Sequence, residues 1–74
     1  MKTKRQRFEK VAGNRVQSII DKLELLGNCS NRNNYEYNEQ DVRKMFDAIR
    51  EHLKISEQRF NQKITRDRKT KFKF

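Results

Sequence analysis

Apolar residues recur at the spacing of an α-helix in two separate stretches of the chain. The first stretch steps by three or four residues through Phe8, Ala12, Val16, Ile19, Leu23 and Leu26. The second steps in the same way through Val42, Phe46, Ile49, Leu53, Ser56, Phe60 and Ile64. Because each set lies on one face of a helix, the pattern predicts an all-α fold with two long helices, about 5–26 and 39–65.

Residues at the ends of these stretches fit helix boundaries. Gly27 follows the first stretch, where a left-handed glycine commonly ends a helix. Asn38 precedes the second stretch and is a candidate N-cap. Glu39 and Asp41 would place negative charge in the first turn, where the helix dipole favours it. Both boundaries therefore agree with the periodicity.

The first helix has one ambiguous position, at Gly13 and Asn14. Asn14 and Gln17 have the spacing of a capping pair, which would split the helix and give a three-helix unit. The apolar pattern runs through this position without a change of phase. We therefore expect one continuous helix.

The two apolar faces match when the helices are laid antiparallel. Leu26 then lies opposite Val42 at one end, and Phe8 lies opposite Phe60 at the other. Between them a small residue meets a small residue, because Ala12 lies opposite Ser56. The pattern predicts an antiparallel helical hairpin that forms one domain, 1–74, with a basic N-terminal arm (1–7) and a basic C-terminal tail (66–74).

Further apolar residues flank both faces, and they are Val11, Ile20, Leu25, Met45 and Ile55. A face this wide suits a helix that packs against more than one neighbour. A symmetric homodimer that forms a four-helix bundle is the simplest arrangement. A different protein partner would cover the same surface, and the alternative is a marginal monomer whose flanks only shield the seam.

The segment GNCSNRNNYEYNEQD between the two stretches is rich in asparagine. Asparagine tolerates left-handed backbone and caps helix ends. Tyr35 and Tyr37 could lay their rings over Leu26 and Val42 and keep their hydroxyl groups in water. We interpret the segment as a structural cap. The alternative is a partner-binding loop made of Asn31, Asn34, Tyr35 and Tyr37.

Size and composition indicate a small intracellular domain. The chain has 74 residues, of which 32% are hydrophobic, and Cys29 is its only cysteine. Without a disulfide, a signal peptide or an apolar run of about 20 residues, we expect a reduced, cytoplasmic protein with no membrane span. A membrane-surface role also fits a basic and aromatic tail, but no lipidation signal supports it.

The net charge of +9 is concentrated at the two ends of the chain. Basic residues outnumber acidic ones five to one in 1–10 and seven to one in 59–74, whereas 11–58 hold seven basic and eight acidic residues. An antiparallel hairpin would bring both ends together, which predicts binding to DNA or RNA. The candidate phosphate contacts are Lys2, Lys4, Arg5, Arg7, Arg66, Arg68, Lys69, Lys71 and Lys73. Phe72 and Phe74 would stack on unpaired bases; the alternative is a solvated tail.

Residue types needed for catalysis or metal binding are scarce. Two glycines 14 residues apart cannot form a glycine-rich phosphate loop, and one cysteine with one histidine cannot form a typical zinc site. A dyad of Cys29 and His52 is geometrically poor, because His52 lies about 21 Å along the second helix. We therefore expect no enzyme, no catalytic residue, no metal and no cofactor.

The segments RFEKVAGNRV, LLGNCSNRNNYEYNEQDVRKMF and AIREHL resemble small basic proteins encoded on conjugative transposons and plasmids of Gram-positive bacteria. The similarity covers about Arg7 to Phe60. It is sharpest in a Gly-Asn-x-Ser-Asn-x-x-Asn-Tyr-x-Tyr loop, here Gly27, Asn28, Ser30, Asn31, Asn34, Tyr35 and Tyr37. The resemblance implies a role in transfer, replication control or evasion of host defence, and it assigns no functional residue.

These observations predict a non-enzymatic accessory protein of a mobile element that binds nucleic acid through its basic ends. The alternative is a protein-binding inhibitor or adaptor, for example a factor that blocks a host defence nuclease, such as an anti-CRISPR. There the basic end would compete for the nuclease's nucleic-acid contacts, and Tyr35 and Tyr37 would anchor the complex. A third reading is a structural subunit of a helical bundle that binds no acidic ligand.

Overall fold

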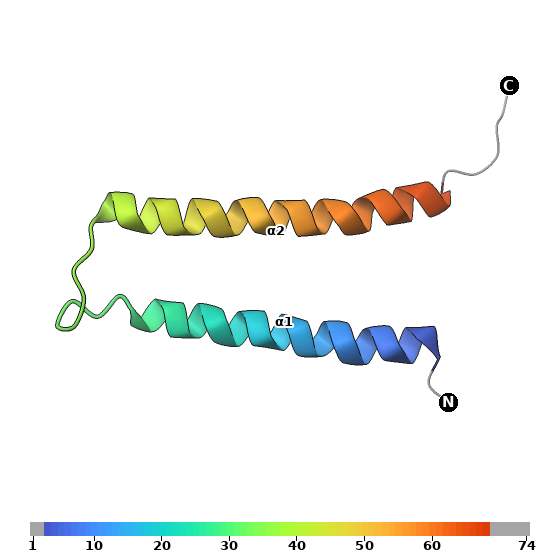
Figure 1. The fold of residues 1–74 in the computed structure, drawn as a ribbon, viewed down its shortest axis with the longest axis horizontal. Coiled ribbons are helices and arrows are strands. Elements are labelled where there is room, and N and C mark those ends of the chain that lie inside the picture. The colour runs from blue at the N-terminus through green and yellow to red at the C-terminus, as the bar shows by residue number, and fades with distance from the viewer. Residues whose placement is uncertain (1–2, 69–74) are drawn as a thin grey trace, which may run out of the picture. The chain divides into compact units, whose positions relative to one another are not determined.

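The computed structural model describes residues 3–68 and shows two α-helices joined by a connecting segment (Figure 1). Helix α1 comprises Lys4–Asn28, which is 25 residues, and helix α2 comprises Glu39–Arg68, which is 30 residues. No β-strand occurs among the described residues. The predicted all-α class and the two long helices are confirmed, and each helix extends two or three residues beyond an expected end. The chain divides into two compact units between Glu36 and Tyr37.

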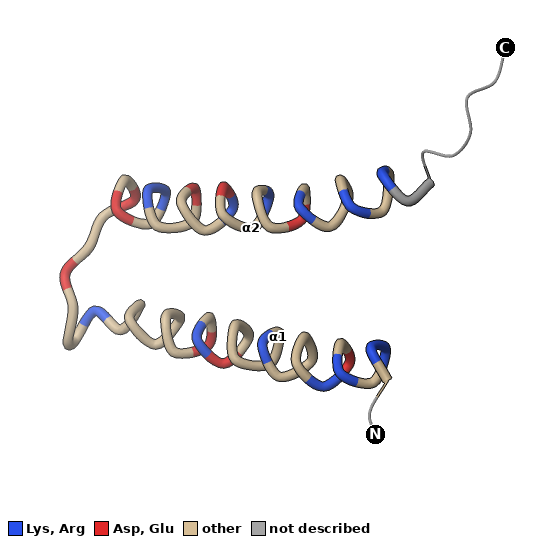
Figure 2. Tube along the Cα trace, turned by 45° about the vertical axis from the view of Figure 1, so that its right-hand side comes forward, with Lys and Arg blue, Asp and Glu red and all other residues tan. Residues whose placement is uncertain are grey.

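Each helix is amphipathic, and the residues of its apolar face are exposed or half-buried. None of the side chains described within residues 3–66 is buried. Leu53 and Phe60 on α2 are 65% and 57% exposed, and Ile19 on α1 is 59% exposed. Acidic and basic residues occur along both helices between the apolar and uncharged polar ones (Figure 2). Neither helix has, in its described residues, an apolar stretch long enough to cross a membrane. The antiparallel ladder and the homodimer stay predictions.

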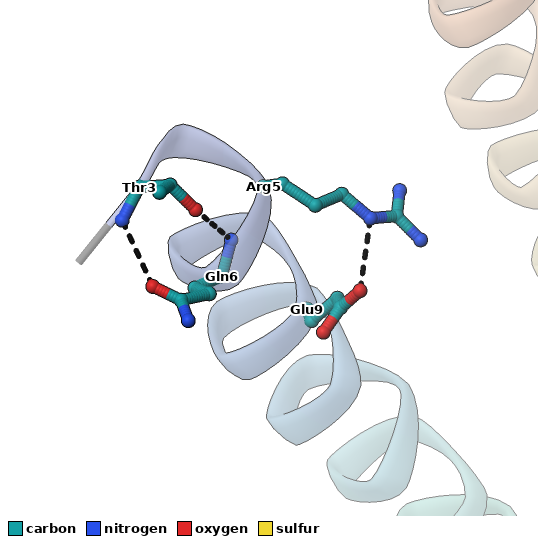
Figure 3. Close-up of polar contacts among 4 residues, drawn as sticks. All are labelled: Thr3, Arg5, Gln6 and Glu9. Carbon is teal, nitrogen blue, oxygen red and sulfur yellow. Dashed lines mark hydrogen bonds and ion pairs between the residues drawn. The ribbon is translucent and has the colours of Figure 1, made fainter.

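A capping box that the sequence analysis did not identify begins α1. The Thr3 Oγ1 atom accepts a hydrogen bond from the Gln6 backbone N–H at 3.1 Å, and the Thr3 backbone N–H donates to Gln6 Oε1 at 3.0 Å (Figure 3). These two bonds satisfy backbone donors that have no partner inside the helix. The N-cap therefore orders the first turn, so Lys4, Arg5 and Arg7 are helical.

Helix α1 passes through Gly13 and Asn14 without a break, which confirms the continuous helix. Gln17 does not form a capping pair there, because its Nε2 donates to Asp21 Oδ1 at 2.9 Å, one turn further along. A glycine inside a helix costs about 1 kcal/mol relative to alanine. The hydrogen bonding of the rest of the helix offsets that cost.

The predicted end of α1 at a left-handed Gly27 is wrong. Gly27 lies inside the helix, and neither glycine has a positive φ. The C-cap is Cys29, which keeps right-handed backbone at φ −70° and ψ −5°. The Cys29 N–H donates to the Leu26 carbonyl at 2.9 Å, and the Ser30 N–H donates to the Gly27 carbonyl at 3.1 Å. These tight turns satisfy the last carbonyl groups, so no left-handed residue is needed.

Asparagine serves the connecting segment as a hydrogen-bond acceptor. Its asparagines do not use the left-handed backbone that this residue tolerates, because no described residue has a positive φ. Instead, Asn31 Oδ1 accepts from the Asn33 N–H at 2.9 Å, and the Asn31 carbonyl accepts from the N–H groups of Asn34 and Tyr35 at 3.1 and 3.0 Å. Three bonds therefore converge on Asn31 and order the turn.

Asn38 is the N-cap of α2, as predicted. Its Oδ1 accepts from the Asp41 N–H, and its own N–H donates to Asp41 Oδ2, both at 2.9 Å. Tyr37 and Val42 occupy the two positions of a hydrophobic staple around this cap, and both are half-buried. Tyr35 is 53% exposed, so the two tyrosines differ in their surroundings.

Replacing Gly27 with alanine should stabilise the protein, because nothing lies within 4 Å of the position that the new Cβ would take. We expect the free energy of unfolding to rise by about 0.5–1 kcal/mol in urea titrations followed by circular dichroism. Gly13→Ala is the matched control, since Gly13 is equally open and helical. A loss of stability in Gly27→Ala alone would mean that α1 ends at a left-handed Gly27 in solution.

If the apolar faces pair with those of a second copy, the unfolding midpoint should rise with protein concentration. Ile20 and Met45 flank these faces and are 43% and 38% exposed. Ile20→Glu combined with Met45→Glu should therefore abolish the concentration dependence. Ser18→Glu with Gln40→Glu adds the same charge at exposed polar positions and should preserve it. A wild-type chain that sediments as a monomer at tens of micromolar would contradict self-association.

Candidate nucleic-acid interface

The first two turns of α1 carry four exposed basic side chains and one acid. The cations are Lys4, Arg5, Arg7 and Lys10, and the acid is Glu9. The side chains of Lys4, Arg7 and Lys10 form no hydrogen bond or ion pair within the described part of the chain. Their ammonium and guanidinium groups therefore remain available to an anionic ligand.

Arg5 is already engaged within α1. Its Nε donates to Glu9 Oε1 at 2.9 Å (Figure 3), and its guanidinium carbon lies 5.7 Å from the centroid of the Phe8 ring. The two side chains of the ion pair are 74% and 58% exposed, so the pair contributes only about 0.3–0.5 kcal/mol. A phosphate contact through Arg5 would have to compete with Glu9, which the sequence pattern did not indicate.

The helix dipole distinguishes the two basic ends of the chain. The first turn of α1 contains no acidic residue, although the positive end of a helix dipole favours negative charge. Cations at this position are repelled by the positive end of the helix dipole. The cations and the dipole both attract anions. Basic residues near the end of α2 are favoured by the dipole and need no ligand to explain them. The start of α1 is therefore the stronger indication of anion binding.

Three further basic residues line the last part of α2. Arg59, Lys63 and Arg66 follow one another at intervals of four and three residues, so they lie along one side of the helix. All three are exposed, and none forms an ion pair with a described residue. The candidate residues predicted from the sequence included Arg66 but not Lys10, Arg59 or Lys63. The helical spacing was the signal that could have found Arg59 and Lys63.

The middle of the chain is close to neutral. Acidic and basic residues alternate along α1 and α2 in this part, as Figure 2 shows. Arg50 donates to Asp47 at 3.2 Å, and both side chains are well exposed. The net positive charge therefore lies toward the start of α1 and the end of α2.

Several predicted contact residues lie outside the described residues. These are Lys2, Lys69, Lys71, Phe72, Lys73 and Phe74. Arg68 is the last residue of α2. The proposed stacking of the two phenylalanines therefore stays a prediction from the sequence.

The predicted partner-binding loop is partly assembled. Arg32, Asn33, Asn34, Tyr35 and Glu36 line a shallow depression, and Asn31 holds the turn beneath these residues by its three hydrogen bonds. Tyr37 belongs to the start of α2, where it precedes the N-cap. Asn34 and Tyr35 thus share a surface, and Asn31 supports it.

The described residues contain no candidate metal site. Between residues 3 and 68, no three side chains of His, Cys, Asp or Glu are grouped so that they could hold a metal ion. Cys29 is an exposed thiol at the end of α1, and its Sγ lies 4.0 Å from the Leu25 carbonyl oxygen. The arrangement is suited to binding anions through exposed cations.

Comparison with known proteins identifies no relative of the chain. No family model, no curated protein sequence and no solved structure matches the chain.

Proposed function

We propose that the protein binds nucleic acid through the basic start of α1 and the basic end of α2, as a non-enzymatic accessory or regulatory factor. The observation that supports this most is the set of exposed cations without partners at both ends of a chain whose middle is neutral. The resemblance to mobile-element proteins supports a role in transfer, replication control or evasion of host defence.

The charge arrangement favours a polyanion over a single small anion. At the start of α1 and the end of α2, the described cations without partners are Lys4, Arg7, Lys10, Arg59, Lys63 and Arg66. Each helix spreads its cations over about two turns, or roughly 10 Å, which is longer than one phosphate group. A nucleic-acid backbone presents phosphates at regular intervals, and the release of its counterions would drive binding. Antiparallel pairing, as the sequence pattern predicts, would combine both sets of cations.

A second candidate function is binding of a protein partner through the connecting segment. Tyr35 is 53% exposed and lies next to the ordered turn at Asn31. A tyrosine held on a rigid turn offers a large contact area at low entropy cost. This reading suits an inhibitor or adaptor that is anchored through the connecting segment, while its basic ends compete for the nucleic-acid contacts of a nuclease.

Neutralising three cations on α2 should weaken binding in a salt-dependent way. We expect Arg59→Gln, Lys63→Gln and Arg66→Gln together to reduce the slope of log affinity against log salt by up to about 2.7, since each phosphate contact on duplex contributes about 0.9. Fluorescence anisotropy with labelled random-sequence duplex would measure this slope.

The matched control for this triple variant removes the same charge from the neutral middle of the chain. Arg15→Gln, Lys22→Gln and Lys44→Gln replace exposed cations without described partners, and they should leave the slope nearly unchanged. Equal effects of the two triple variants would show that net charge alone determines binding. If the wild-type protein shows no salt-dependent affinity for DNA or RNA, the nucleic-acid proposal is wrong and the protein-binding inhibitor is favoured.

Removing Glu9 should strengthen binding, because Arg5 would lose its competing carboxylate. We expect Glu9→Gln to steepen the salt slope by up to about 1 and to raise affinity several-fold at low salt. Glu24→Gln is the control, because it removes the same charge from a position without a described basic partner. If the two variants bind equally tightly, Arg5 makes no phosphate contact.

A further inference from the structure

The last part of α2 has a polar face with an unusual composition. No acidic residue occurs from Gln58 to Arg66, and the segment holds three amides as well as three cations. Gln62 is two residues from both Phe60 and Ile64, so it lies about 160° around the helix from each of them. Apolar packing through Phe60 and Ile64 would therefore leave the face around Gln62 accessible.

The side chains of this face are grouped in space. Gln58, Asn61, Gln62, Thr65 and Arg66 line one shallow depression on the surface of α2. None of these side chains forms a hydrogen bond or ion pair within the described part of the chain. Gln6 and Gln17 of α1 differ, since Gln6 completes the capping box and Gln17 bonds to Asp21. The amides of α2 thus have unused donors and acceptors.

We propose that Gln58–Arg66 is a recognition segment that reads base edges in the major groove of duplex DNA. This proposal rests on the proposed function, and it specifies duplex DNA as the nucleic acid that is bound. The major groove admits an α-helix, and it presents a distinct donor and acceptor pattern for each base pair. Amide side chains match the adjacent donor and acceptor of adenine, and arginine matches the two acceptors of guanine.

The polar residues of the segment that would contact DNA fall into two groups. Gln62 lies at the centre of the face and contacts a base, with Gln58 and Arg66 one turn away on either side. Arg59 and Lys63 lie toward one edge and contact phosphates of the flanking strand. The amides are stronger evidence for base reading than the cations are, because phosphate binding alone needs no side chain that both donates and accepts hydrogen bonds.

The same face does not suit the other forms of nucleic acid. The major groove of an RNA duplex is too deep and narrow for side chains to read. Single strands are held mainly by aromatic side chains that stack on bases, and Phe60, the only aromatic residue of the segment, lies on the opposite side of the helix. Duplex DNA is therefore the ligand that this face fits.

The test is selection of bound sequences from a randomised DNA duplex by the full-length protein, followed by affinity measurements. We expect an enriched motif of a few base pairs. Gln62→Ala should lower the discrimination between that motif and a scrambled duplex by roughly 5- to 150-fold, which is the range for one bidentate base contact. Lys63→Ala should weaken binding to both duplexes alike and reduce the salt slope by about 1.

Gln40→Ala is the matched control, because it removes an exposed amide from the first turn of the same helix. Alanine favours helix more than glutamine does, and circular dichroism would verify that both variants are folded. Salt-dependent binding without an enriched motif, or tighter binding to RNA or single strands, would overturn this inference and leave the proposed function intact. Absence of any nucleic-acid binding would overturn both.

Discussion

Covering the apolar faces of α1 and α2 is the constraint on which the rest of this molecule depends. Isolated helices are marginal in water even when their residues favour helix, so most helical stability in proteins comes from packing an amphipathic face. Here no described side chain is buried, and residues such as Leu53 and Phe60 are mostly exposed. Whatever surface covers these faces also determines which polar faces point outward. The position of a cation or amide around the helix, relative to that apolar face, therefore determines whether it stays accessible to a ligand.

Local hydrogen bonds set where the helices begin and end, and the sequence predicted these ends unevenly. The cap at Asn38 was predictable because asparagine is a favoured N-cap residue and precedes the second apolar stretch. The structure adds that Asn38 and Asp41 exchange two hydrogen bonds. Thr3 and Gln6 have the spacing of a capping box, but they lie within a run of basic residues and before the first apolar position, Phe8. The helix end predicted at Gly27 was wrong because glycine permits a left-handed helix end without requiring one. The turn bonds of Cys29 and Ser30 satisfy the last carbonyls with ordinary backbone.

The net charge of the candidate interface was predictable from the sequence, but the ion pairs of its cations were not. Counting residues located the excess of cations at the ends of the chain, because charge follows from composition alone. Whether a cation is available depends on its neighbours one turn away. Arg5 is bound to Glu9, whereas Lys4 and Arg7 are not. The face around Gln62 was predictable in part, because the expected helix 39–65 already contains Gln58 and Gln62. Arg66 joins this face because α2 continues to Arg68.

Binding of the proposed polyanion would be coupled to folding at the start of α1. Its first turn places cations where the helix dipole opposes them, and this arrangement costs stability in the free protein. The capping box of Thr3 and Gln6 offsets part of that cost, since it satisfies two backbone donors. A bound polyanion would neutralise the cations and complement the dipole at the same time. Any ligand that binds only the folded chain stabilises it by mass action. The same charges that recruit the ligand would thus make α1 most stable when the ligand is bound.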